Sequence, residues 1–190
     1  MAWSAESNDE ELMLHYRDGD AGAFEALYTR HKGGLYRYLL RQCRNAAAAE
    51  ELFQDVWMNL VRARAGYTVQ AKFTTYLYRV AHNRLVDHYR KSNQAALVPL
   101  EDEDGAAIAD PPDERERSQD ETLDAKRQVG RLMELISELP ETQREAFLLQ
   151  QEGGMSVEEI AQATGVSRET AKSRLRYAIS KLRRGMLEWR

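Results

Sequence analysis

The sequence predicts an all-α protein, with two small helical domains joined by a flexible acidic linker. Apolar residues recur at spacings of three and four through most of the 190 residues, which is the period of one helix face. No strand-like alternation persists anywhere. Residues 96–124 lack this period and contain three of the four prolines, so they cannot bury enough apolar surface to fold. The expected domains are therefore residues 9–95 and 125–190.

Three helix starts are predicted in the first domain by short polar residues. Asp9 can cap a helix over Glu10–Arg17, and Asp20 can cap a longer one, because their carboxylates accept hydrogen bonds from free N–H groups of the first turn. Asn45 can cap a third helix over Ala46–Arg64 in the same way.

A fourth helix is predicted over Phe73–Arg90, after a break at Gly66. Its inward positions share one face and are Phe73, Leu77, Val80, Ala81 and Leu85. Helical spacing returns after the linker, around Leu123, with Val129, Leu132, Met133 and Ile136 expected to point inward. Pro140 either ends that helix or starts the next one at its first turn, and Gly153–Gly154 ends the next helix.

The C-terminal part predicts a helix-turn-helix. Ser156-Val157-Glu158-Glu159 matches a capping box, so a short helix over Val157–Thr164 follows. Gly165 suits the left-handed turn, and Ser167 caps a second helix through Leu182.

The outer face of this second helix is basic and is expected to bind DNA. Its first turns would read base edges in the major groove, and basic residues further along would contact phosphates. The candidate residues are Ser167, Arg168, Thr170, Lys172, Ser173, Arg174 and Arg176.

The formal net charge of −4 is distributed unevenly along the sequence. Between Glu101 and Asp124, eleven acidic residues against two arginines give −9, so the remaining chain carries +5. Five basic residues and one aspartate give Lys72–Lys91 a charge of +4, and eight basic residues with two glutamates give Ser167–Arg190 a charge of +6. Two basic segments separated by an acidic one are typical of a nucleic-acid-binding protein.

Other classes of function find no support in the sequence. A single cysteine, Cys43, excludes an internal disulfide and indicates a reduced, cytoplasmic setting, where we expect it to be a buried apolar residue. No apolar run approaches the roughly 18 residues of a membrane span, so no membrane insertion is expected. The four histidines lack metal-ligand spacing, and no phosphate loop or nucleophile motif occurs. We expect no enzyme activity, no metal and no cofactor.

Motifs in both halves resemble the extracytoplasmic-function (ECF, group 4) sigma factors of RNA polymerase. Those similar to the sigma-2 domain are Ala49-Glu50-Glu51-Leu52, Gln54-Asp55-Val56-Trp57, Phe73, Tyr76-Leu77-Tyr78-Arg79-Val80-Ala81 and Asn83. Those similar to the sigma-4 domain are Leu139-Pro140-Glu141, Gln143-Arg144-Glu145, Phe147-Leu148-Leu149, Ser156, Glu158-Glu159-Ile160-Ala161 and Thr170-Ala171-Lys172-Ser173-Arg174-Leu175. The resemblance covers about Glu11–Lys91 and Lys126–Arg184.

The resemblance implies an alternative sigma factor. Such a protein binds core RNA polymerase, directs it to specific promoters and assists promoter melting to initiate transcription. The implied partners are core RNA polymerase, promoter DNA and an anti-sigma factor, and we expect a monomer when the protein is free. The helix-turn-helix would bind the −35 element.

The resemblance also implies two sites in the first domain. Catching unpaired bases requires aromatic rings beside a basic groove, and the candidates for −10 recognition and melting are Tyr76, Arg79, His82, Asn83, Arg84 and Arg90. The loop Gly66–Lys72 resembles the family's specificity loop, which holds an extruded base. Residues at i, i+3, i+4 and i+7 of one helix would dock on polymerase: Glu51, Gln54, Asp55 and Met58. Trp57 is either core or the edge of that interface.

Two rival functions use parts of the same pattern. An operator-binding dimeric regulator would explain Ser156–Leu182 but leaves the first half unused. A sigma mimic that titrates an anti-sigma factor would have a degraded basic helix at Phe73–Lys91, which looks intact. The acidic linker is either a regulatory tether that shields the basic faces or a passive spacer.

Overall fold

The computed structural model describes residues 3, 7–95 and 119–189, and over these residues it is helical, with no strand. This confirms the predicted all-α class. The first domain consists of α1 (Asp9–Arg17), α2 (Ala21–Cys43), α3 (Ala46–Ala63), the 3-10 turn η1 (Arg64–Gly66) and α4 (Phe73–Ala95). The second consists of α5 (Gln119–Glu138), α6 (Glu141–Gly153), α7 (Val157–Thr164) and α8 (Arg168–Glu188).

Side-chain caps start the first three helices. Asp20 accepts from the N–H groups of α2 and Asn45 from one of α3, as predicted. The prediction for α1 was wrong by one residue: Asn8 is the cap, and its side chain accepts from Glu10 N at 2.8 Å. Asp9 lies inside the helix, because its carboxylate pairs with Arg30 and His31 of α2.

The core of the first domain is rich in aromatic rings. Trp57 of α3 is 5% exposed and packs edge-on against Phe24 and Tyr28 of α2. Trp57 therefore belongs to the core, which settles the alternative left open by the sequence. Cys43 is partly buried; its thiol donates to the Leu39 carbonyl, and burial raises its pKa to about 11.

Helix α5 differs most from expectation. It begins at Gln119, inside the predicted linker, whose residues 96–118 lie outside the described part of the chain. Leu123, where helical spacing was expected to return, is 53% exposed, and Val129, expected to point inward, is 50% exposed. The linker was predicted from the loss of apolar periodicity, but most residues of α5 have high helix propensity (Leu, Glu, Gln, Arg, Ala, Lys and Met), so the helix can extend without being buried.

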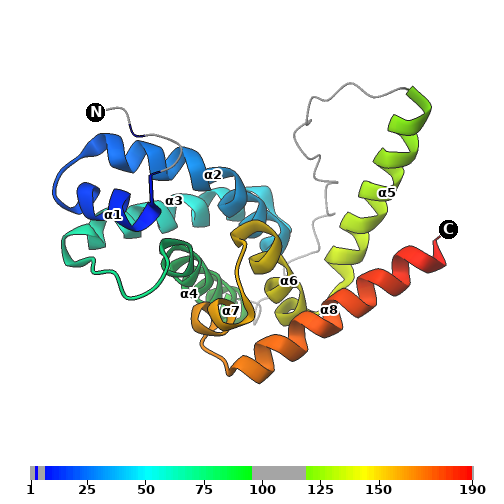
Figure 1. The fold of residues 1–190 in the computed structure, drawn as a ribbon. Helices are drawn as coiled ribbons and strands as arrows, with labels where there is room; N and C mark the ends of the chain where they lie inside the picture. Colours follow the sequence, from blue (N-terminus) through cyan, green and yellow to red (C-terminus); the bar gives the residue numbers. More distant parts are fainter. Residues whose placement is uncertain (1–2, 4–6, 96–118, 190) are drawn as a thin grey trace.

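The two domains pack into one body (Figure 1). Helix α6 lies against α2 and α4, and α7 lies against α4, whereas α5 and the end of α8 extend away from the first domain. Gly34 of α2 permits the close approach, because a Cβ there would lie 3.0 Å from the carbonyl oxygen of Glu152 at the end of α6. No described helix is both long and apolar enough to cross a membrane.

Candidate nucleic-acid and polymerase interfaces

One face of α4 carries four of the six residues predicted for −10 recognition. Tyr76, Arg79, Asn83 and Arg90 follow one another at intervals of three, four and seven, so they share a helix face. Arg79, Asn83 and Arg90 are exposed, whereas Tyr76 is half-buried. The face combines a ring, an amide and two guanidinium groups, the groups that can stack on bases, bind base edges and contact phosphates.

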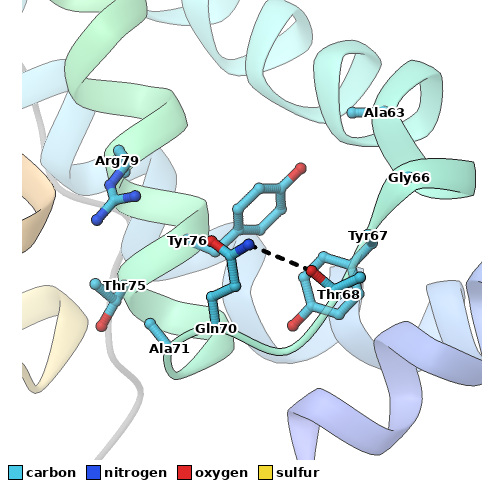
Figure 2. Close-up of a pocket in the computed structure, with 9 residues that line it drawn as sticks. All are labelled: Ala63, Gly66, Tyr67, Thr68, Gln70, Ala71, Thr75, Tyr76 and Arg79. Carbon is cyan, nitrogen blue, oxygen red and sulfur yellow. Dashed lines mark hydrogen bonds between the residues drawn. The ribbon is translucent and has the colours of Figure 1, made fainter.

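A cavity of about 390 Å³ lies beside this face, between α4 and the loop that follows η1. Figure 2 shows residues of the loop and of α4 around it. Its lining residues are Ala63, Gly66, Tyr67, Thr68, Gln70, Ala71, Thr75, Tyr76 and Arg79. The volume falls in the range of roughly 300–1,000 Å³ typical of small-ligand pockets, so a single base can enter it.

The floor of this cavity is aromatic. Tyr67 is 6% exposed, and its ring stands edge-on to that of Tyr76 at a centroid distance of 5.3 Å. Burial, together with the nearby Glu10 carboxylate, raises the pKa of Tyr67 to about 12. The Tyr67 hydroxyl therefore stays protonated at neutral pH. It is buried without a hydrogen-bond partner.

His82 and Arg84 do not lie on the face shared by the other four residues. His82 points to the second domain, where its Nδ1 lies 2.6 Å from Oε1 of Glu145 on α6. Arg84 lies 4.0 Å from Asp87 of its own helix. In this arrangement His82 is engaged between the domains and is not presented to DNA.

The contact between the domains is polar and largely buried. The same Glu145 oxygen accepts from the Tyr38 hydroxyl at 2.8 Å, and Glu145 is only 6% exposed. Burial and the adjacent carboxylate raise the pKa of Tyr38 far above its usual value. Arg144, also 6% exposed, donates to the Gln42 side chain at 2.9 Å, and burial lowers its pKa.

A second cluster joins α2 to the end of α6. The Glu152 carboxylate binds Arg37 at 2.9 Å and Arg41 at 2.5 Å, and its side chain is only 8% exposed. An ion pair between the exposed Lys72 and the half-buried Glu159 links the loop before α4 to α7 at 2.8 Å. Because the ammonium group of this pair is open to solvent, the pair contributes little, and Glu145, Arg144 and Glu152 are the more deeply buried polar groups at this contact.

These interdomain groups were absent from the sequence-based site. A weak signal existed, since Arg144 and Glu145 sit directly before the apolar run 146–149 in a 13-residue helix. Four successive apolar residues cannot all lie on one helix face. Helix α6 therefore had to be buried on more than one side, with its charged residues in contact with a partner.

The predicted polymerase-docking face is intact and open. Glu51, Gln54, Asp55 and Met58 are exposed along α3, and Met58 is 47% exposed. The intervening Leu52, Val56 and Leu60 are buried. This separation leaves an acidic face, with one exposed apolar side chain, free for a partner.

The helix-turn-helix forms as predicted. Ser156 and Glu159 make the reciprocal capping box, Gly165 has φ +69°, and the Ser167 side chain caps α8 by accepting from Thr170 N. Helix α8 continues to Glu188, six residues beyond the predicted end. The first turn of α8 presents Arg168 and Glu169 to solvent.

Three candidate residues on α8 are exposed and three are half-buried, Thr170 among them, and the cap Ser167 is exposed. Arg168, Lys172 and Arg176 are exposed, whereas Ser173 and Arg174 are partly buried. Arg168 forms ion pairs with Glu158 of α7 and with Glu169. Arg176 stacks on the ring of Tyr177, with its guanidinium carbon 5.1 Å from the centroid. Lys172 has no such competitor among the ion pairs of the described residues.

Family models match both domains. The model for sigma-70 region 2 matches residues 27–95, and the model for sigma-70 region 4 matches residues 130–182. Together these two segments cover more than half of the chain. The α4 face and its cavity lie in the first match, and the helix-turn-helix in the second.

Similar proteins are ECF sigma factors over most of their length. The chain is 33% identical to the RNA polymerase sigma factor CarQ of Myxococcus xanthus, over 90% of this chain and 93% of that protein. It is 31% identical to the ECF RNA polymerase sigma factor SigK of Mycobacterium sp. (strain KMS), over 90% of this chain and 87% of that one.

Two solved structures share the fold. One is CnrH in complex with the cytosolic domain of CnrY, with a TM-score of 0.64, 21% identity, and coverage of 92% of this chain and 94% of that one. The other is the sigma factor RpoE with the anti-sigma factor NepR from Bartonella quintana, with a TM-score of 0.67, 20% identity, and coverage of 87% and 96%. The chain belongs to the extracytoplasmic-function family of RNA polymerase sigma factors, the regulatory subunits that direct the polymerase to specific promoters and initiate transcription.

Proposed function

We propose that this sigma factor binds polymerase, the −10 element and the −35 element through three separate surfaces. Residues 9–95 act as the sigma-2 domain and residues 125–190 as the sigma-4 domain, with 96–124 as the connection between them. The protein binds core RNA polymerase and promoter DNA in the cytoplasm, and it is a monomer when free. An anti-sigma factor controls it, a proposal supported by the anti-sigma complex of RpoE, whose fold it shares.

The α4 face with its adjoining cavity carries the proposal for the −10 element. Tyr76 stacks on an unpaired base, Asn83 binds a base edge, and Arg79 and Arg90 hold the phosphates. The cavity of about 390 Å³ receives the extruded base. His82 joins this surface only when α6 has moved away from α4, since it now contacts Glu145. Arg84, whose nearest charged group is Asp87 of its own helix, contacts phosphate from the flank of the α4 face.

The other two surfaces act on polymerase and on upstream DNA. The exposed face of α3 docks on the polymerase through Glu51, Gln54, Asp55 and Met58. Its acidic residues orient the protein on a complementary surface and raise the rate of association. The N-terminal turns of α8 read the −35 element from the major groove. There, Arg168 and Lys172 contact bases and Arg176 contacts phosphate.

The experiment uses core polymerase, the full chain and a promoter selected by it. Run-off transcription tests whether this protein alone makes initiation promoter-specific; a dimeric regulator and a sigma mimic do not. Permanganate reactivity of unpaired thymines then tests melting. Tyr76→Ala and Asn83→Ala should bind the closed promoter but open it poorly. Gln128→Ala, an exposed amide on α5, is the matched control. Normal opening by both α4 variants contradicts the proposed role.

A further inference from the structure

We propose that α1 is a positioning element for the base-binding loop. Glu10 and Arg17 hold the two ends of the loop Tyr67–Lys72 and thereby set which base the cavity accepts. The inference rests on the proposed function of that cavity. Neither residue lines the cavity, so both act through the loop.

The first anchor is at the C-terminal end of the loop. The Glu10 carboxylate accepts a hydrogen bond from the backbone N–H of Phe73 at 2.5 Å. Phe73 is the first residue of α4, and its N–H has no partner within the helix. A carboxylate there also interacts favourably with the helix dipole. The cap of α4 thus comes from a residue 63 positions away, and it fixes where α4 begins.

The second anchor is at the N-terminal end. The Arg17 guanidinium donates to the carbonyl oxygen of Tyr67 at 3.3 Å. Asp18 holds the same guanidinium from the side, at 2.8 Å from its Nε, and so limits its rotamers. Through this bond α1 fixes the position of the Tyr67 backbone. The Tyr67 ring packs against Tyr76 on the cavity floor.

The spacing of the anchors makes α1 a spacer of defined length. Glu10 and Arg17 are seven residues apart, two helical turns, so their backbones are separated by about 10 Å along one face. The chain between the anchored atoms carries the lining residues Thr68, Gln70 and Ala71. Within it, Gln70 donates to Thr68 at 3.5 Å, a long bond that restrains little (Figure 2).

Helix α1 is rigid enough to serve this role. Leu12 and Met13 are fully buried, and Asp9 is paired with Arg30 and with His31 on α2. The restraint on the loop is therefore transmitted from the domain core. A cavity whose lining is held by a rigid external element discriminates between bases better than one on a free loop, because a rigid lining does not rearrange to fit a wrong base.

The test measures base preference and keeps it separate from stability. Initiation is measured with core polymerase on a promoter panel that carries each of the four bases at every −10 position. Glu10→Ala and Arg17→Ala should lower the preference for the best base over the next by about fivefold or more at one position, the scale of a lost base contact. Preference at the −35 element and affinity for core polymerase should not change.

Three further variants make the result decisive. Glu10→Gln keeps an acceptor oxygen for Phe73 N–H and should retain most of the preference. Glu11→Ala, exposed on the same helix turn, is the matched control and should behave as wild type. Gln70→Ala alters the cavity wall itself and tests the cavity directly.

The outcomes separate the inference from its premise. If Glu10→Ala and Arg17→Ala lower initiation equally at every base, α1 contributes only stability and the inference is overturned. If Gln70→Ala shifts the preference while the α1 variants do not, the cavity reads bases and only the positioning role is lost. If none of the three shifts it, the cavity does not read bases, and both proposals are wrong.

Discussion

Glu145 is the buried carboxylate that both Tyr38 and His82 contact across the domain interface. Glu145→Ala removes the acceptor of the Tyr38 hydroxyl, which is fully buried while the domains pack. An unsatisfied buried hydroxyl costs about 1–3 kcal/mol. Water satisfies that hydroxyl once the domains separate, so the cost falls on the packed arrangement alone. The ratio of packed to separated molecules should fall by roughly 5- to 150-fold.

A second substitution should reverse part of this loss. Tyr38→Phe removes the stranded hydroxyl, and replacing both partners of a hydrogen bond costs much less than removing one. The double variant Tyr38→Phe with Glu145→Ala should therefore pack better than Glu145→Ala alone. Glu134→Gln is the control, because Glu134 is an exposed carboxylate whose ion pair lies within α5.

Distances between the domains can be measured by double electron–electron resonance. Spin labels are placed at Arg62→Cys and Gln162→Cys, both exposed and one in each domain, in a Cys43→Ala background. The wild type should give one narrow distance distribution, and Glu145→Ala a broad, longer one. If Glu145→Ala keeps the narrow distribution, the buried network does not hold the domains together. The same conclusion follows if adding Tyr38→Phe to Glu145→Ala does not narrow the broadened distribution.

Three further predictions concern the other surfaces. Glu51→Lys with Asp55→Lys should abolish co-purification with core polymerase at unchanged helicity, because reversed charges oppose a complementary surface; undiminished co-purification contradicts docking through α3. Lys172→Ala should relax the preference for one base pair of the −35 element. Arg176→Ala should weaken binding to all DNA sequences alike and lower the slope of log affinity against log salt concentration by about one. Binding to single-base variants distinguishes these, and uniform weakening by both variants would mean that α8 positions the protein without reading sequence. Asp9→Asn should destabilise the fold by roughly 1 kcal/mol at neutral pH. Burial would raise the pKa of Asp9, but His31 and Arg30 outweigh it and lower the pKa below 3.8. The stabilisation is present above about pH 4 and is lost as the pH falls through the folded value, so the two proteins should converge in acid. A stability difference that persists at pH 2 in thermal unfolding would show that the contribution of Asp9 is not ionic.

Local chemistry made most helix boundaries predictable. Asn45, Ser156 and Ser167 cap helices in the structure as the sequence predicts, because each cap depends on a backbone N–H only three positions away. The prediction failed where a distant group intervened. Asp9 was expected to cap α1, but Arg30 and His31 bind its carboxylate and leave the cap to Asn8.

The amino-acid sequence by itself determined the all-α class, the helix-turn-helix and the polar faces of α3, α4 and α8. Periodicity shows which side chains share a face, but it does not show what that face meets. Helical spacing already separates His82 from the face of Tyr76 and Asn83. Tertiary packing alone decided what His82 meets there, since Glu145 binds both Tyr38, 107 residues away, and His82, 63 residues away. Such contacts depend on the relative placement of whole helices, which is the sum of many weak packing terms and leaves no local pattern in the chain.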